Sequence, residues 1–241
     1  MSSAKNKRQV DFQAIAQWVH QGDHVLDLGC GRGVLLEYLK QKKAIYALGV
    51  DIDQHKILNC LKRGVNAYQS DIKYFLNQLE PKSFDRVILS RTVDQLDDPG
   101  WIIQKSLEVG KRVTVGFVNY AFWFNRINML IKGTKLNNET YRNPWYESMP
   151  SNTFSISEFE SFCHNKGIKI HRRICYAGDW SKKQLFLLYK LSQIRVLWDT
   201  FITIVYLRKG CQKKKHLFVV FLYFVFFIFF SPNLVCLTTP G

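Results

Sequence analysis

Apolar and polar positions alternate along the chain with two periods, one typical of strands and one typical of helices. Short apolar runs predict strands near residues 24–28, 45–50, 65–69, 86–89, 112–118, 168–175 and 184–191. Helical patterns fall between them, near residues 33–43, 54–63, 101–109 and 156–166. This alternation is typical of βαβ units, in which helices join parallel strands. Two consecutive strands at the end predict that one strand is antiparallel.

The composition fits one sizeable folded domain followed by a different C-terminal segment. The 241 residues are 47% hydrophobic and 22% charged, which excludes a disordered chain. We expect a domain over residues 1–190, a basic linker over 191–215 and a hydrophobic tail over 216–241. The six cysteines form no CxxC pair, so we expect reduced thiols in a cytoplasmic protein and no metal site.

The net charge of +15 favours an anionic partner, whether a phosphorylated metabolite, an acidic protein, a membrane surface or nucleic acid. Simple solvation of the surface by lysine and arginine is the alternative. Neither a helix-turn-helix nor an RNP motif accompanies the charge, so we do not expect nucleic acid as a partner.

The hydrophobic tail contains 14 consecutive apolar or aromatic residues, from Leu217 to Phe230. As a helix this run measures about 21 Å, which is short of the roughly 30 Å hydrocarbon core of a membrane. Three lysines at 213–215 precede it and suit the cytoplasmic flank of a membrane anchor. An anchor that tethers a cytoplasmic domain, a spurious extension and a packed helix are the three interpretations of this pattern.

Candidate chemistry begins where the first predicted strand meets a glycine-rich turn. Asp27 lies in the strand, and Gly29, Cys30, Gly31 and Gly33 follow it before a helix opens. Glycines leave space where a nucleoside must approach the backbone at the carboxyl end of a strand. An ordinary tight turn between a strand and a helix is the alternative.

Two further carboxylates follow the next strands. Asp51 ends the second strand, 24 positions after Asp27, where a carboxylate can accept hydrogen bonds from both hydroxyls of a ribose. Asp71 follows the third strand at the same sheet edge, where a carboxylate can accept from an adenine amino group. A strand-end cap for Asp51 and a helix cap for Asp71 are the alternatives.

These motifs, DLGCGRG, GVD and QSD, resemble the class I S-adenosylmethionine (SAM)-dependent methyltransferases over roughly residues 20–190. The resemblance implies a Rossmann-like α/β fold, with a seven-stranded, mostly parallel sheet and helices on both faces. It also implies that SAM, or its demethylated product S-adenosylhomocysteine (SAH), lies over the glycine turn. The residues that it assigns to this ligand are Asp27, Gly29, Cys30, Gly31, Gly33, Asp51, Ile52, Asp71, Ile72 and Ser90.

A more specific resemblance runs nearly without gaps over residues 8–190. The stretches DFQAIAQWVHQGDHVLDLGCGRGVLLEYL, KRGVNAYQSDI and RVTVGFVNYAFWFNRI are similar to the MetW family of methionine-biosynthesis proteins. The family has the methyltransferase fold, and its members are partners of homoserine O-acyltransferase. The resemblance implies a protein that binds SAM or SAH and supports that enzyme.

The sequence departs from the MetW pattern at several polar positions. The family's GCGDG is GCGRG here because Arg32 replaces an acidic residue, and Arg91 and Phe122 replace a glutamine and a histidine. The polar candidates for the reaction pocket are Ser90, Arg91, Asp94 and Asn119. None of them identifies an acceptor, so the catalytic residues stay unknown. An active methyltransferase on a small molecule is the alternative function.

A long segment, residues 119–155, separates the fifth predicted strand from the next helix. It carries seven aromatic residues, namely Tyr120, Phe122, Trp123, Phe124, Tyr141, Trp145 and Tyr146. A segment of this length is usually a lid or a binding surface. A substrate lid, a docking face for a partner enzyme and additional core over the sheet edge are the three interpretations.

Overall fold

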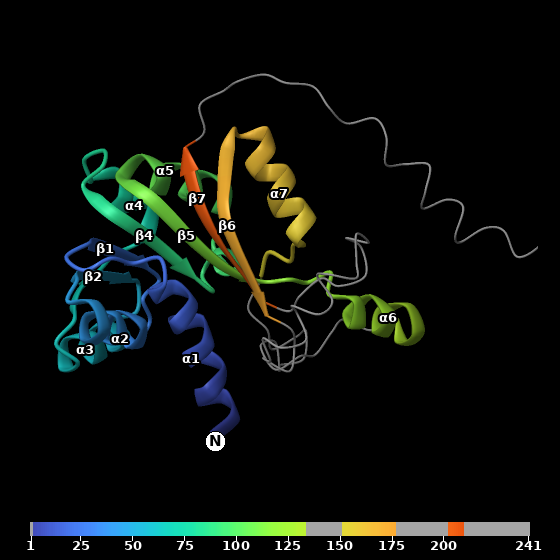
Figure 1. Cartoon of the computed structure of the whole chain (residues 1–241), viewed down its shortest axis with the longest axis horizontal. Coiled ribbons are helices and arrows are strands. Elements are labelled where there is room, and N and C mark those ends of the chain that lie inside the picture. The colour runs from blue at the N-terminus through green and yellow to red at the C-terminus, as the bar shows by residue number, and fades with distance from the viewer. Residues whose placement is uncertain (1, 134–150, 177–201, 210–241) are drawn as a thin grey trace, which may run out of the picture. The chain divides into compact units, whose positions relative to one another are not determined.

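A computed structural model describes residues 2–133, 151–176 and 202–209 (Figure 1). The elements before the central glycine turn are α1 (Ser2–Ala16) and β1 (His24–Leu28). The elements that follow are α2 (Val34–Lys43), β2 (Tyr46–Asp51), α3 (Gln54–Lys62), β3 (Asn66–Gln69), α4 (Ile72–Asn77), β4 (Phe84–Ser90), the 3-10 helix η1 (Val93–Gln95), α5 (Pro99–Val109), β5 (Gly110–Val118), α6 (Trp123–Lys132), α7 (Ile156–Asn165), β6 (Ile168–Tyr176) and β7 (Ile202–Lys209).

The strands form one sheet in the order β3-β2-β1-β4-β5-β7-β6. Strands β1 to β5 run parallel to their neighbours, and β7 is antiparallel to both β5 and β6. The chain order reverses beside β1, which pairs with β2 on one side and with β4 on the other. In open α/β sheets, ligands bind outside the carboxyl ends of the strands at such a switch point.

The helices cover both faces of the sheet, because alternate side chains of each strand point to opposite sides. Val25 of β1 and Ile88 of β4 pack with residues of α1, α2 and α3 in one core cluster. Leu26 and Val87 pack with residues of α4, α5 and α7 in the other. Figure 1 shows the same division into two helical layers. The predicted α/β architecture, a largely parallel sheet with helices on both faces, is confirmed.

The last strand of the sheet differs from the prediction. Strand β7 is formed by residues 202–209, which lie inside the segment that we expected to be a basic linker. The linker prediction is therefore wrong over these residues, and the domain extends to at least residue 209. The strand that the sequence predicts at 184–191 lies outside the described residues. An apolar run with β-branched residues, ITIVYL, marks the strand that forms β7.

The hydrophobic tail at 216–241 also lies outside the described residues. Within the ranges that the structure describes, no helix has both the length and the apolar character that a membrane crossing requires.

Candidate functional site

The turn between β1 and α2 is held in a conformation that glycine favours. Gly29, Gly31 and Gly33 have φ angles of 76°, 58° and 73°, in the left-handed region. A Cβ atom on Gly29 would lie 2.5 Å from Thr92, and one on Gly33 would lie 2.9 Å from the Cys60 sulfur. A Cβ on Gly31 would meet nothing within 4 Å. The turn is therefore tightly packed at its two ends and open at its middle glycine.

Asp51 ties this turn to the end of β2. Its Oδ2 atom accepts a hydrogen bond from the Gly31 N–H at 3.0 Å, and its Oδ1 atom accepts from the Asp53 N–H at 3.0 Å. The Lys56 ammonium lies 3.4 Å from Oδ1. A carboxylate offers about four acceptor positions, so a fourth donor can still bind. The strand-end capping role therefore exists, and it leaves capacity for a ligand hydroxyl.

Asp27 is the most unusual group in the site. Its side chain is buried, and its Oδ1 atom has no hydrogen-bond partner in the structure. Burial, and secondarily the negative charge of Asp51, raise the pKa of Asp27 to about 7. A buried acceptor without a donor costs free energy, and a bound cation or N–H donor removes that cost.

Cys30 faces away from the open side of the turn. Its sulfur lies 3.8 Å from the Cys60 sulfur, and the Cys60 thiol donates a hydrogen bond to the Gly31 carbonyl at 3.2 Å. A Cβ on Gly49 would lie 2.6 Å from the Cys30 sulfur, so this glycine makes room for the thiol. Burial raises the pKa of both thiols, which stay protonated. The Cys30 side chain therefore packs against Cys60 and Gly49 on the buried side of the turn.

Asp71 serves as a helix cap, as one of its two interpretations predicts. It is the N-cap of α4, and its Oδ1 atom accepts from the Tyr74 N–H at 3.0 Å. The Ser70 N–H donates to the Asp51 carbonyl, which holds the end of β3 beside the end of β2. Ile52, next to Asp51, is 69% exposed, and Ile72 is half-buried at the start of α4. Each of these apolar side chains therefore directly follows one of the two carboxylates in the chain.

The polar candidates at the ends of β4 and β5 are engaged in the fold. Arg91 has a φ of 57°, and its guanidinium is 2.5 Å from the buried carboxylate of Asp11 in α1. Asn119 is fully buried, and its side-chain oxygen accepts from the Ala121 N–H. Asp94 is buried, and Ser90 ends β4 half-buried. The structure therefore brings the four candidates to one edge, where Arg91 and Asn119 act as structural residues.

The aromatic segment divides into a packed part and an exposed part. Phe154 lies 4.7 Å from Phe117 between ring centres and adds to the core, although it is not one of the seven aromatic residues named from the sequence. Helix α6 instead leaves apolar side chains in solvent, with Leu130 86% and Ile131 74% exposed. Three of the aromatic residues singled out in the sequence, Tyr141, Trp145 and Tyr146, lie outside the described residues.

Two residues that contact the predicted site were not predicted from the sequence. Thr92 packs beneath Gly29 from the segment after β4, and Lys56 reaches Asp51 from α3. A lysine one turn into the helix after Asp51 is a local signal that could have indicated the second contact. The first contact joins two parallel strands, and nothing in the local sequence marks it. Across the described part of the chain, no cluster of three or more metal-ligating side chains occurs.

Comparison with known proteins gives a family and a fold. The family model described as methionine biosynthesis protein MetW matches residues 9–196. The bifunctional methionine biosynthesis protein MetXA/MetW of Rhodopirellula baltica is 28% identical over 121 residues, which are 47% of this chain and 19% of that protein. A ubiquinone biosynthesis O-methyltransferase of Neisseria meningitidis is 29% identical over 90 residues, which are 35% of this chain and 38% of that enzyme.

The chain thus spans well under half the length of these two curated relatives. A solved SAM dependent methyltransferase from Archaeoglobus fulgidus superposes with a TM-score of 0.58 at 19% identity, over 85% of this chain and 94% of that one. This likeness shows the Rossmann-like fold of SAM-dependent methyltransferases.

Proposed function

The chain belongs to the family of the methionine biosynthesis protein MetW, and from this premise we propose that it binds SAM or SAH and supports a homoserine O-acyltransferase. Bound SAM supplies a sulfonium whose methyl group is already activated for transfer, whereas SAH signals that a methyl group has been used. Both ligands carry the same adenosine and the same amino-acid ammonium.

The observation that carries the binding proposal is the buried Oδ1 atom of Asp27, which has no hydrogen-bond partner. The ammonium of SAM or SAH is the kind of donor that would satisfy it, and the positive charge favours the ionised form of the carboxyl. Gly31 offers the open backbone beside it, since no atom occupies the space of a Cβ there. The residues present therefore fit the amino-acid part of the ligand.

The nucleoside part fits the neighbouring strand ends. Asp51 retains acceptor capacity for a ribose hydroxyl, and Ile52 offers an exposed apolar surface beside it for a flat base. Asp71 uses Oδ1 as a helix cap, which leaves its second oxygen for an adenine amino group, with Ile72 adjacent. Ser90 belongs to the same edge at the end of β4. We assign these residues, with the glycine turn, to the ligand.

Support of another enzyme is favoured over methyl transfer by the polar residues of the reaction pocket. Arg91 is bound to Asp11, and Asn119 holds a turn, so neither is poised to move a proton. The name of the bifunctional relative pairs MetXA with MetW, which supports a partnership with a homoserine acyltransferase. The O-methyltransferase relative supports the second candidate, an active enzyme on a small molecule.

Calorimetric titration of the full chain with SAH tests the binding step. Asp51→Ala should weaken binding by about 1–3 kcal/mol, because charge-assisted hydrogen bonds to the ribose are lost. Glu80→Ala removes the same charge from an exposed position of the chain and should leave the affinity unchanged. Equal affinities for the Asp51 variant and the parent protein would disprove the site assignment.

A homoserine acyl-transfer assay tests the partnership. The acyltransferase of the same organism is assayed with and without the full chain, at saturating and at zero SAH. A higher rate or a lower KM in the presence of the chain supports the accessory function. If a folded chain that binds SAH has no effect on the acyltransferase, methyl transfer becomes the better proposal, and acceptor screening follows.

A further inference from the structure

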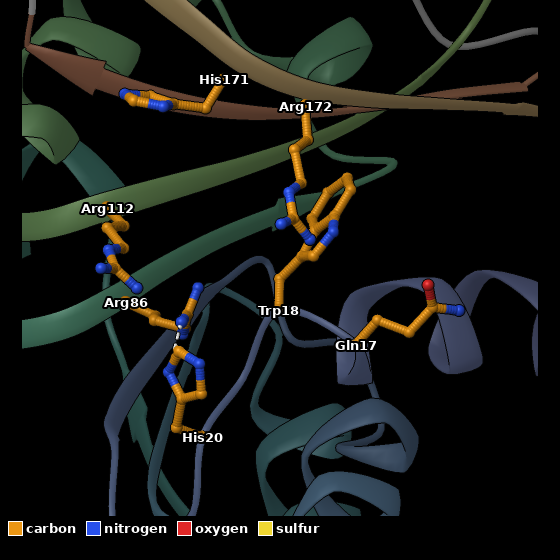
Figure 2. A pocket seen from close by; sticks show the side chains of 7 residues that line it. All are labelled: Gln17, Trp18, His20, Arg86, Arg112, His171 and Arg172. Atoms are coloured by element: carbon orange, nitrogen blue, oxygen red, sulfur yellow. Dashed lines mark hydrogen bonds between the residues drawn. The ribbon is translucent and has the colours of Figure 1, made fainter.

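A cavity of about 350 Å³ opens at the amino ends of β4 and β5, at the edge of the sheet opposite the glycine turn (Figure 2). The residues of its lining that matter here are Trp18, His20, Arg86, Arg112, His171 and Arg172. A second hollow of about 650 Å³ shares His20, Arg86 and Arg112 with it. None of the described residues that line the first cavity carries a carboxylate.

Two arginines lie side by side on adjacent strands of this cavity. Arg86 of β4 and Arg112 of β5 are register partners, so their side chains emerge from the same face of the sheet. Like charges directly opposite one another on neighbouring strands are destabilising. Arg86 is only 2% exposed, which increases the cost of its charge. Local rules of this kind are broken mostly where function requires it.

The buried arginine is held in one orientation. Its Nε atom donates to the Asp23 carboxylate at 2.6 Å, and its Nη2 atom is 2.9 Å from the His20 Nδ1 atom. Because a guanidinium can only donate, the His20 Nδ1 atom accepts, and the proton of the neutral ring lies on Nε2. Figure 2 shows the His20 ring against the Arg86 side chain. The Arg86 guanidinium is therefore held in one orientation on one side of the cavity.

The opposite wall comes from a distortion of β6. The register of β6 with β7 shifts between Ile170 and Arg172, so His171 is the extra residue of a β-bulge. Bulges redirect side chains and are common beside functional sites. Both His171 and Arg172 line the cavity, and Figure 2 shows them on the strand above Arg112 and Arg86. Groups from three strands and from the segment after α1 thus converge on one space.

We propose that this cavity binds a small molecule through a phosphate group. A phosphate presents acceptor oxygens in several directions and carries up to two negative charges, which suits guanidinium groups that arrive from different strands. The volume lies in the range of small-molecule pockets. Asp23 is paired with Arg86, and Asp85 of the second hollow is paired with Lys111, so both carboxylates near the cavity already have cationic partners. The ligand would bind on the opposite sheet edge from SAH, as an effector of this protein.

Titration of the full chain with inorganic phosphate and with pyrophosphate, at constant ionic strength, tests the proposal. The double variant Arg112→Gln and Arg172→Gln should weaken the binding of both probes at least tenfold. Both residues are exposed, so the variant is expected to fold. Arg63→Gln removes a cation that pairs with Glu37 on the surface at the end of α3, and it should change the affinity less than twofold.

An equal loss of affinity in the Arg63 variant would overturn the proposal, because the effect would then reflect net charge alone. So would a titration with chloride at the same ionic strength that reproduces the response to phosphate. The affinity for SAH should be the same in the parent protein and in the double variant. This inference is independent of the proposed SAH site, because a failure of either titration leaves the other unaffected.

Discussion

The two edges of the sheet carry opposite charges. At the carboxyl edge, the strands β1 and β2 and the segment after β3 present Asp27, Asp51 and Asp71. At the amino edge, β4, β5 and the bulge of β6 present arginines and a histidine around one cavity. A sheet has only a small dipole of its own, so the side chains at the strand ends decide which ligand charge each edge accepts.

The edges also differ in how each one accommodates a buried charged side chain, which is Asp27 at the carboxyl edge and Arg86 at the amino edge. Asp27 can take up a proton near neutral pH, because burial and Asp51 raise its pKa to about 7. The buried guanidinium of Arg86 is instead paired with the Asp23 carboxylate at 2.6 Å. The carboxyl edge therefore contains one carboxyl group that titrates near neutral pH, whereas arginines supply most of the charge at the amino edge. Three changes at the carboxyl edge test whether the two edges act independently.

The largest effect is expected from Gly29→Ala. A left-handed φ costs a non-glycine residue about 1–2 kcal/mol, and the collision with the buried Thr92 adds roughly 1–3 kcal/mol of overpacking. We expect the free energy of unfolding to fall by both amounts and the affinity for SAH to fall with it. Urea denaturation and SAH calorimetry measure the two quantities.

The matched control for that change is Gly31→Ala. It has a similar φ but an empty space for the Cβ, so its free energy of unfolding should fall by the backbone cost alone, whereas its affinity for SAH should fall because the added methyl group occupies space assigned to the ligand. Phosphate affinity at the opposite edge should survive both substitutions in the folded fraction. If Gly29→Ala also removes phosphate binding from folded protein, the two edges do not act independently.

An intermediate effect is expected from pH. Because the ligand ammonium favours ionised Asp27, the affinity for SAH should rise roughly tenfold from pH 6 to pH 8. Asp27→Asn should bind SAH more weakly at pH 8 and should show a flat profile. A parent profile as flat as that of Asp27→Asn would contradict the titration of this carboxyl.

Asp27 should also make the free energy of unfolding of the ligand-free protein depend on pH. This dependence has the opposite direction to that of the affinity for SAH. The folded protein holds the Asp27 proton more tightly than the unfolded chain does, between the ordinary pKa of 3.8 and about 7. Its contribution to the free energy of unfolding therefore decreases as the pH rises through this window. Urea denaturation at several pH values should show a smaller decrease for Asp27→Asn.

The smallest effect is expected from Lys56→Gln. The Lys56 side chain is 43% exposed and lies 3.4 Å from the Asp51 carboxylate, and such pairs are worth about 0–1 kcal/mol. Removal of the ammonium frees an acceptor position on Asp51, so SAH should bind slightly more tightly. Lys62→Gln, at the exposed end of the same helix, is the control. Weaker binding would mean that Lys56 itself contacts the ligand.

The carboxyl edge could be predicted from the sequence because its signals are local. A strand, three glycines and a helix follow one another within 20 residues, and Asp51 ends the very next strand. Even there, the burial of Asp27 could not be predicted, since it depends on how strands pair and on which atoms reach the carboxyl. The capping bond of Asp71 was one of two interpretations that its sequence position allows.

The amino edge could not be predicted in the same way. His20, Arg86, Arg112 and Arg172 are far apart in the chain, and each one alone is typical of a solvated surface. Strand pairing brings them together, and the bulge at His171 has no clear signature in a sequence. The strand at 202–209 was not predicted for a related reason, because an apolar run alone does not show which strand it pairs with. Pairing with Val113 to Val118 of β5 identifies residues 202–207 as part of a strand of this sheet.

The place of β7 also bears on how the protein is made. β7 follows β6 in the chain but lies between β5 and β6 in the sheet. During synthesis, β6 therefore leaves the ribosome before β7, the strand with which it pairs. Until residue 209 has emerged, β5 has an open edge, and such edges recruit strands of other nascent chains. Any shortened chain that ends before residue 202 keeps that edge, and it is expected to aggregate rather than to report on either binding site.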